Sequence, residues 1–318
     1  MDLQLTEDQQ ALVSGLQDIL ADHAVLPQAE RFSYAWHDAD LQALLAESGF
    51  LDAAREIGAL EGALVTFEAA KSVSALDTIG AGLVAPLALP GERFAGPVAL
   101  ANAAGLAKAI RNLPIAGTLL IDCGEDVAML AVESESVERV ESIYAFPYGR
   151  FTTAPDLKAA QRVRGAGMAL RQWWRVGIAA EIAGAADAAI AFTIDYVKQR
   201  HVFGRPVGSF QAVQHRLAQR HGWAKATYYL AMKAAWSGEA ADADIAACHA
   251  QLGIQRLMFD MHQFHGGMGV TLEHLLHFWT YRIRALQAEA GGLSASSLAI
   301  AGQRWAEQTP VAIRAVSA

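Results

Sequence analysis

One cluster of residues in the C-terminal half of the sequence has side chains suited to holding a large anionic ligand. Residues 200–211 place a cation, Arg200, an aromatic ring, Phe203, and an amide, Gln211, around a glycine turn. An arginine can hold a phosphate through two parallel hydrogen bonds. Two plainer interpretations stay open, because a cation often caps its own helix C-terminus and a phenylalanine often packs in a core.

A second cluster follows some sixty residues later. Gln263 lies one helical turn before a glycine-rich run that includes Gly266 and Gly267. Free backbone amides at such a turn can meet a phosphate, although the same glycines also suit a tight turn between helices. No strand precedes them, so they do not form the dinucleotide-binding fingerprint of a βαβ unit. The two clusters together predict a flavin cofactor site.

The hydrophobic periodicity predicts a mainly α fold in three parts. Residues 1–89 form a helical domain whose first helix starts with a capping box at Thr6 and Gln9 and runs to about Ala24. Residues 90–160 form a reduced β region, and residues 161–318 form an antiparallel helical bundle. The expected bundle helices cover residues 171–200, 210–236, 242–265, 271–288 and 293–317. The expected strands cover residues 118–121, 127–132 and 137–140.

Composition narrows the class of protein. The chain has 318 residues, 53% of them hydrophobic, and a net charge of -8, which argues against binding to nucleic acid or to an anionic membrane surface. We expect no membrane span and no signal peptide. The only two cysteines, Cys123 and Cys248, fit no metal spacing and favour a reduced, cytoplasmic protein. Histidine pairs near residues 262–277 lack the cysteines or carboxylates of a metal site, so no metal is expected.

The two clusters resemble the C-terminal helical domain of the acyl-CoA dehydrogenase family. The motifs are Arg-x-x-Phe-Gly followed by Phe-Gln within residues 200–211, and Gln-x-x-Gly-Gly-x-Gly-x-Thr-x-Glu over residues 263–273. Segments 5–9, 44–51 and 79–86 resemble the first helical domain of that family. The similarity covers both ends of the chain and is weak in the middle.

The resemblance implies a cofactor and a reaction. It implies FAD, bound mainly by a neighbouring subunit, and an acyl-CoA thioester that loses a proton from its α carbon and a hydride from its β carbon. The reaction needs a carboxylate base. The residues at the cofactor-contacting positions are Arg200, Phe203, Gln211, Gln263, Gly266 and Gly267.

The sequence departs from the family where the chemistry should occur. Counted from Tyr281 and Arg282, the usual base position falls on Gly291, and an alternative base position falls on Trp174. Glu289 is a weak substitute, with an exposed helix-end carboxylate as its expected role. The family's flavin-ring loops are also missing from the middle region.

Three hypotheses follow. The first is a degenerate subunit, like the short subunits of heteromeric dehydrogenases acting on steroid side chains, that completes the FAD site of a full-length homologue. The others are a non-catalytic scaffold or ligand-binding homologue and a stand-alone dehydrogenase using Glu289. Assembly with such a homologue or with itself, as a dimer or dimer of dimers, is expected, and electron-transfer flavoprotein is a further candidate partner.

Overall fold

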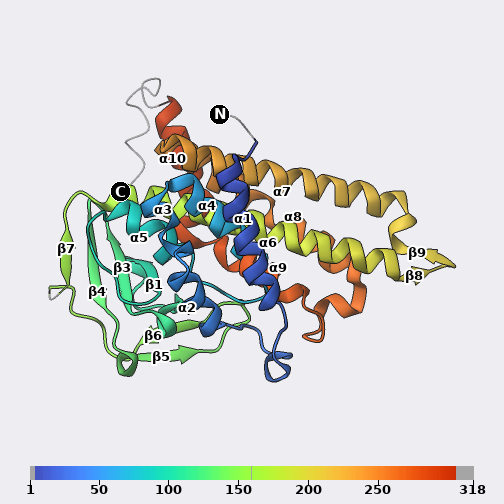
Figure 1. Ribbon diagram of the computed structural model, residues 1–318, viewed down its shortest axis with the longest axis horizontal. Coiled ribbons are helices and arrows are strands. Elements are labelled where there is room, and N and C mark those ends of the chain that lie inside the picture. The colour runs from blue at the N-terminus through green and yellow to red at the C-terminus, as the bar shows by residue number, and fades with distance from the viewer. Residues whose placement is uncertain (1–3, 159, 306–318) are drawn as a thin grey trace, which may run out of the picture.

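A helical N-terminal part, a β region and a long helical bundle follow one another along the chain (Figure 1). The structure is a computed structural model that describes residues 4–158 and 160–305. The bundle runs across the molecule, with the β region beside one of its ends. This order confirms the mainly α fold predicted from the sequence. The N-terminal part contains α1 Glu7–Asp22, η1 Gln28–Glu30, α2 Ala39–Glu47, η2 Phe50–Asp52, α3 Ala53–Glu56, α4 Ala59–Ala69, the π-helical turn η3 Gly80–Val84 and α5 Ala85–Ala88.

The predicted capping box begins α1. The Thr6 hydroxyl accepts a hydrogen bond from the Gln9 amide at 3.2 Å, and the Gln9 side chain accepts one from the Thr6 amide at 3.0 Å. Two N–H groups that the helix leaves unpaired are thereby satisfied. The helix ends at Asp22, two residues before the end predicted at Ala24.

Replacing Thr6 by alanine should lower the free energy of unfolding by about 1 kcal/mol, the usual loss on removing an N-cap hydroxyl. Urea denaturation of Thr6→Ala beside Thr6→Ser measures the effect. The serine variant keeps the hydroxyl and should retain most of the wild-type stability, so an equal loss in both variants would contradict the capping role.

The β region consists of two small sheets. One has the strand order β1-β3-β4-β7, with β1 parallel to β3, and the other has the order β2-β6-β5. The three predicted strands are present as β3, β4 and β5, whereas β1, β2, β6 and β7 were not predicted. Because β7 pairs with β4, the sheet extends beyond the boundary that we expected at residue 160. The strands are β1 Val98–Asn102, β2 Ile110–Arg111, β3 Thr118–Cys123, β4 Asp126–Ala131, β5 Val137–Val140, β6 Tyr148–Phe151 and β7 Gln161–Val163, with short helical turns η4 Ala103–Gly105, η5 Leu113–Ile115 and η6 Ser134–Ser136.

The bundle is built around α6, which packs against α4, α7, α8 and α9. This helix is long and apolar enough to span a membrane, but 72% of its most apolar window is buried inside the protein. Gly184 of α6 lets α4 approach closely, since a Cβ there would lie 2.0 Å from the Phe67 carbonyl oxygen. The bundle elements are α6 Gly167–Gln199, β8 His201–Val202, β9 Arg205–Pro206, η7 Val207–Ser209, α7 Gln211–Ser237, α8 Ala240–His265, η8 Gly266–Val270, α9 Leu276–Leu286, η9 Glu289–Gly291 and α10 Gly292–Trp305. The last helix was predicted to reach residue 317, but residues 306–318 lie outside the described part.

Candidate functional site

The residues predicted to contact a cofactor lie at one end of the bundle. Arg200 caps the C-terminus of α6, Gln211 is the first residue of α7, and Gln263 lies in the last turn of α8. These ends meet because α6, α7 and α8 pack side by side and α7 reverses the direction of both neighbours (Figure 1). The Tyr196 hydroxyl, one turn before Arg200, donates a hydrogen bond to the His265 carbonyl at 3.3 Å. We call this region the bundle-end cluster. Its members are all exposed: Arg200, Phe203, Gln211, Gln263, Gly266 and Gly267.

The hairpin of β8 and β9 projects from this end and carries Phe203 at its tip. The ring is 96% exposed, and Phe203 adopts a positive φ of 52°, which is uncommon for a bulky residue. The alternative interpretation of Phe203 as a core residue is therefore wrong within this chain. The Arg200 carbonyl accepts a hydrogen bond from the Val207 amide at 2.7 Å. Among the described residues, none hydrogen-bonds the side chains of Arg200, Gln211 or Gln263, so their polar groups face outward.

The glycine-rich turn has both open and crowded positions. Gly266 ends α8 with a φ of +60°, and neither it nor Gly267 would place a Cβ within 4 Å of another heavy atom. The backbone of these two residues is thus open to an approaching ligand. Gly269 differs, since a Cβ there would lie 2.9 Å from the His262 carbonyl oxygen. The turn interpretation explains Gly266 and Gly269, whereas packing inside the chain does not account for Gly267.

Two histidines near the end of α8, His262 and His265, pack beside this turn. The His262 ring contacts the Gly269 carbonyl through Nδ1 at 2.6 Å and the Thr280 hydroxyl through Nε2 at 3.0 Å. Burial lowers the pKa of His265 to about 4, and its ring stacks on Tyr196. In residues 4–158 and 160–305 no group of three or more His, Cys, Asp or Glu side chains has an arrangement able to hold a metal ion. The histidines fix the glycine-rich turn as neutral, packed rings.

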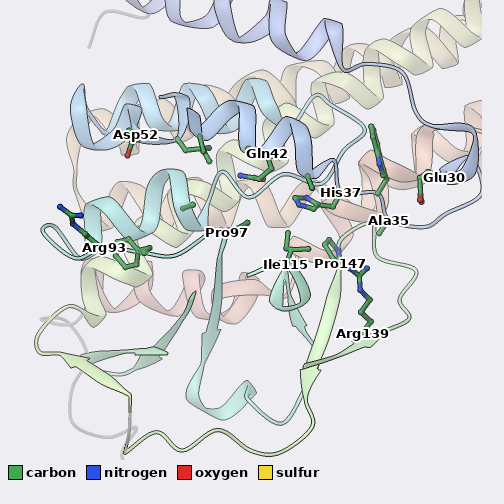
Figure 2. A pocket seen from close by; sticks show the side chains of 18 of the residues that line it. Glu30, Ala35, His37, Gln42, Asp52, Arg93, Pro97, Ile115, Arg139 and Pro147 are labelled. Carbon is green, nitrogen blue, oxygen red and sulfur yellow. The ribbon is translucent and has the colours of Figure 1, made fainter. Parts of the chain in front are cut away.

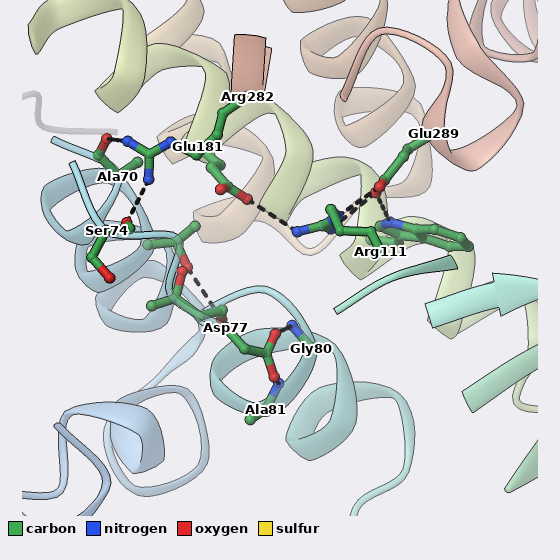
Figure 3. A network of polar contacts seen from close by, with 12 residues as sticks. Ala70, Ser74, Asp77, Gly80, Ala81, Arg111, Glu181, Arg282 and Glu289 are labelled. Atoms are coloured by element: carbon green, nitrogen blue, oxygen red, sulfur yellow. Dashed lines mark hydrogen bonds and ion pairs between the residues drawn. The ribbon is translucent and has the colours of Figure 1, made fainter. Parts of the chain in front are cut away.

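A second polar site lies beside the N-terminal half of α6 and contains Glu289 of η9. Its carboxylate receives two hydrogen bonds from Arg111, from Nε at 2.6 Å and from Nη2 at 2.9 Å (Figure 3). The indole N–H of Trp174 donates a third at 3.1 Å. The Glu289 side chain is 15% exposed, so the expectation of an exposed helix-end carboxylate is wrong. Trp174, where the resemblance predicts an alternative base position, thus donates a hydrogen bond to the carboxylate that lies two residues before Gly291.

Glu181 of α6 completes this buried ion cluster. Its carboxylate lies 3.7 Å from Nη1 of Arg111, whose guanidinium also lies 4.7 Å from the centre of the Phe146 ring. Burial raises the pKa of Glu181 to about 7, and nearby Arg111 opposes this rise. Burial would lower the pKa of Arg111, but Glu289 and Glu181 together hold it above its usual value. The arginine is therefore charged and occupied on two sides.

Gly291, where the resemblance predicts the base position, meets a backbone requirement. Its φ is +84°, and a Cβ there would lie 2.6 Å from the Cβ of Ala295. The neighbouring Ala290 also has a positive φ, 50°. A residue with a side chain at position 291 would be strained and crowded in this turn.

Glu181 should make stability depend on pH. Its folded pKa, about 7, lies above the ordinary value of 4.5, so the folded state binds its proton more tightly than the unfolded state. Its contribution to stability is therefore present below about pH 4.5 and lost as the pH rises through about 7. Chemical denaturation from pH 4.5 to 8 should show a steeper loss for wild type than for Glu181→Gln. Parallel curves for the two proteins would contradict this assignment.

Comparisons with known proteins agree with this architecture. Residues 166–304 match the family model described as acyl-CoA dehydrogenase, C-terminal domain. Acyl-CoA dehydrogenase IpdE2 of Mycobacterium tuberculosis is 38% identical over 108 residues, 33% of each chain. Acyl-CoA dehydrogenase FadE34 of the same organism is 37% identical over 124 residues, 36% of this chain and 17% of the relative. The matched segments thus span at most about a third of these curated relatives.

Solved structures match over nearly the whole chain. A chain of the ChsE4-ChsE5 complex from Mycobacterium tuberculosis has a TM-score of 0.76 at 23% identity, with 98% of this chain and 100% of that chain covered. Butyryl-CoA dehydrogenase from Megasphaera elsdenii has a TM-score of 0.74 at 21% identity, covering 95% and 99%. The fold is that of an acyl-CoA dehydrogenase. With the match over residues 166–304, the C-terminal part of the chain is an acyl-CoA dehydrogenase C-terminal domain, and the curated relatives that it matches are acyl-CoA dehydrogenases, a class of oxidoreductases.

Proposed function

We propose that this chain is a subunit of a heteromeric, FAD-dependent acyl-CoA dehydrogenase and that it completes the FAD site of a partner subunit without supplying the catalytic base. The observation that carries the proposal is the bundle-end cluster, whose polar side chains have no partner among the residues described and project away from the chain. A surface of this kind could contact a ligand that is held mainly by another subunit. We further propose that it acts in the cytoplasm.

The cluster suits the anionic half of FAD. Arg200 offers a guanidinium for a phosphate, and the open turn at Gly266 and Gly267 allows backbone to approach closely. Phe203 offers a ring face for an aromatic base, and Gln211 and Gln263 offer amide donors and acceptors. These groups match a pyrophosphate with an attached adenosine.

The buried ion cluster supports the absence of a base. Bound FAD would accept the hydride from the β carbon of an acyl-CoA thioester. Removal of the α proton needs a carboxylate within hydrogen-bond reach of it, and Glu289 has both oxygens engaged by Arg111 and one also by Trp174. This argues against a stand-alone dehydrogenase that uses Glu289, and it leaves the proton transfer to the partner.

Apolar side chains on two bundle helices support assembly. Tyr229 and Trp236 of α7 are exposed, and so are Leu252 and Phe259 of α8. Each pair is seven residues apart, which places its members on one face of the helix. A structural relative is titled as a complex, ChsE4-ChsE5, and another as a steroid ACAD. We therefore propose that the chain assembles through the bundle with a full-length homologue or with a second copy. The proposed substrate of the complex is an acyl-CoA thioester of the steroid side-chain type, and electron-transfer flavoprotein is a candidate electron acceptor.

Flavin content tests the division of labour. The chain purified alone should carry little FAD, whereas co-expression with a full-length homologue should give a complex with stoichiometric flavin absorbance. Full flavin loading of the isolated chain, or reduction of an electron-accepting dye by it on addition of acyl-CoA, would contradict the proposal.

Arg200→Ala should weaken FAD binding in the reconstituted complex by about tenfold or more, since a charge-assisted hydrogen bond contributes roughly 1.5–3 kcal/mol. The measurement is flavin retention during dilution, followed by fluorescence. Lys198→Ala removes an exposed cation two residues earlier that pairs with Asp195, and it serves as the control. Unchanged FAD affinity in Arg200→Ala would favour a non-catalytic scaffold.

A further inference from the structure

A large cavity lies between the N-terminal helices and the β region, apart from the bundle-end cluster. Its volume is about 1090 Å³, which is large enough for a small organic molecule. Its walls come from the loop before α2, one face of α2, the segment before β1, and the turns that carry Ile115 and Pro147 (Figure 2). None of the bundle-end residues lines it, and neither does any member of the buried ion cluster.

The fold keeps this cavity open through α2. The buried face of α2 carries Leu41 and Leu45, both fully buried. The face toward the cavity carries Ala39, Ala43 and Ala46, whose side chains are too short to reach the opposite wall. Unfilled apolar space forgoes packing contacts that a ligand would restore.

Apolar side chains line part of the cavity, beside the polar side chains of Gln42 and His37. Phe94, Pro97 and Ile115 line it together with the alanines of α2, and Figure 2 shows Pro97 and Ile115 on the side opposite Gln42 of α2. The segment that carries Phe94 is fixed to β3, because Ala95 exchanges two hydrogen bonds of 3.1 Å with the Thr118 hydroxyl. This wall is therefore preformed, which reduces the ordering that binding would require.

The charges at the cavity favour an anion. Three arginines and two carboxylates line it, an excess of one positive charge when His37 is neutral. Asp52 pairs with Arg55 at 3.3 Å, and the Glu30 carboxylate accepts a hydrogen bond from Ser33 at 2.6 Å. The guanidinium groups of Arg93 and Arg139 have no hydrogen bond or ion pair to any residue in the described ranges. Figure 2 shows Arg93 at the end of the cavity where Asp52 also lies, and Glu30 toward the opposite end.

We propose that this cavity binds an elongated apolar molecule with a single carboxylate, the carboxylate at Arg93 and the apolar body along the alanine face of α2. Two arginines of the cavity lack a protein partner. Arg139 lies toward the end where the Glu30 carboxylate also lies, whereas the Asp52 carboxylate at the end of Arg93 is already paired with Arg55. Arg93 can therefore offer a charge-assisted hydrogen bond to such an acid. No base or nucleophile is required, because the site binds and does not transform its ligand. The site is independent of the proposed FAD contact.

Calorimetric titration of the full chain tests the site with octanoate, 1-octanol and inorganic phosphate. Octanoate should bind at one site, 1-octanol about tenfold more weakly, and phosphate without measurable affinity. Arg93→Gln should weaken octanoate binding about tenfold and leave 1-octanol unaffected. Ala43→Trp, which fills the cavity from an exposed helix position, should abolish binding of both.

The control is Arg162→Gln, which removes an exposed arginine of β7 outside the cavity and should change nothing. Equal binding of octanoate to Arg93→Gln and wild type would overturn the position of the carboxylate. Octanoate binding that survives Ala43→Trp would overturn the cavity. Tight binding of phosphate alone would show a simple anion site without an apolar body, and would also overturn the proposal. The FAD-binding experiment with the complex tests the bundle-end cluster, which is a different surface. The cavity proposal and the FAD proposal can therefore fail separately.

Discussion

Replacing Arg111 by methionine is expected to lower the free energy of unfolding by about 3–5 kcal/mol, which is the usual effect of removing one partner from a buried ion pair. Arg111 is 7% exposed and is shared by Glu181 and Glu289, which come from different parts of the bundle. Without it, Glu289 would lose its cation and Glu181 would keep only the electrostatic influence of Arg282. Urea denaturation at neutral pH measures the loss.

Two comparisons show whether the ion cluster is responsible. Arg150→Met removes an exposed arginine that pairs with Glu138 on the neighbouring strand, and it should alter stability by less than about 1 kcal/mol. Arg111→Met combined with Glu289→Gln should recover part of the loss, because the glutamine still accepts a hydrogen bond from Trp174. The single-variant defect should also shrink at lower pH, where the carboxylates bind protons. A double variant as unstable as Arg111→Met alone would contradict this account.

Replacing Arg282 by methionine should cost about 3 kcal/mol or more, because several buried carbonyl groups would lose their donor. Arg282 is 1% exposed and donates to the carbonyls of Ser74 at 2.7 Å, Ala70 at 3.1 Å and Ser72, besides that of Phe278 in its own helix (Figure 3). Burial lowers the pKa of Arg282 to about 10, which still leaves it charged at neutral pH. The Arg282 side chain thus connects α9 to the loop that follows α4 through hydrogen bonds.

Arg284 provides the matched comparison, two residues along the same helix and exposed. Arg284→Met should behave like wild type in thermal denaturation, whereas Arg282→Met should unfold at a clearly lower temperature. Amide exchange would locate the defect, with faster exchange expected at residues 70–74 and in α9. Equal stability of the two variants would mean that the carbonyl contacts contribute little.

Local pattern was enough to predict most of the helices. The capping box at Thr6 and Gln9, the apolar repeats and the glycines after the bundle helices are all local signals, and the first helix and the first three bundle helices appear within a few residues of their expected ranges. By contrast, α9 begins five residues later than expected, and the predicted end of the last helix lies outside the described residues. The strands were harder. β1 contains two alanines and an asparagine, which have weak strand preference. Its formation as a strand depends on parallel pairing with β3, some twenty residues away.

The ion cluster was missed because its partners are distant in sequence. Glu289 and Arg111 are separated by 178 residues, so nothing near Glu289 indicated a buried role. One signal was present: Glu181 stands alone in the apolar run of residues 178–186, and a single carboxylate in such a run usually needs a buried cation. The bundle-end cluster was easier to predict because helix ends joined by a short turn must lie together.

The length of α6 places the buried ion cluster and the bundle-end cluster far apart on the same helix. Glu181 and Arg200 are nineteen positions apart on this helix, a rise of about 28 Å at 1.5 Å per residue. Variants at the two positions should therefore combine additively, since they share no neighbours. Substitutions around Glu181 can therefore change the buried ion cluster without altering the geometry at Arg200.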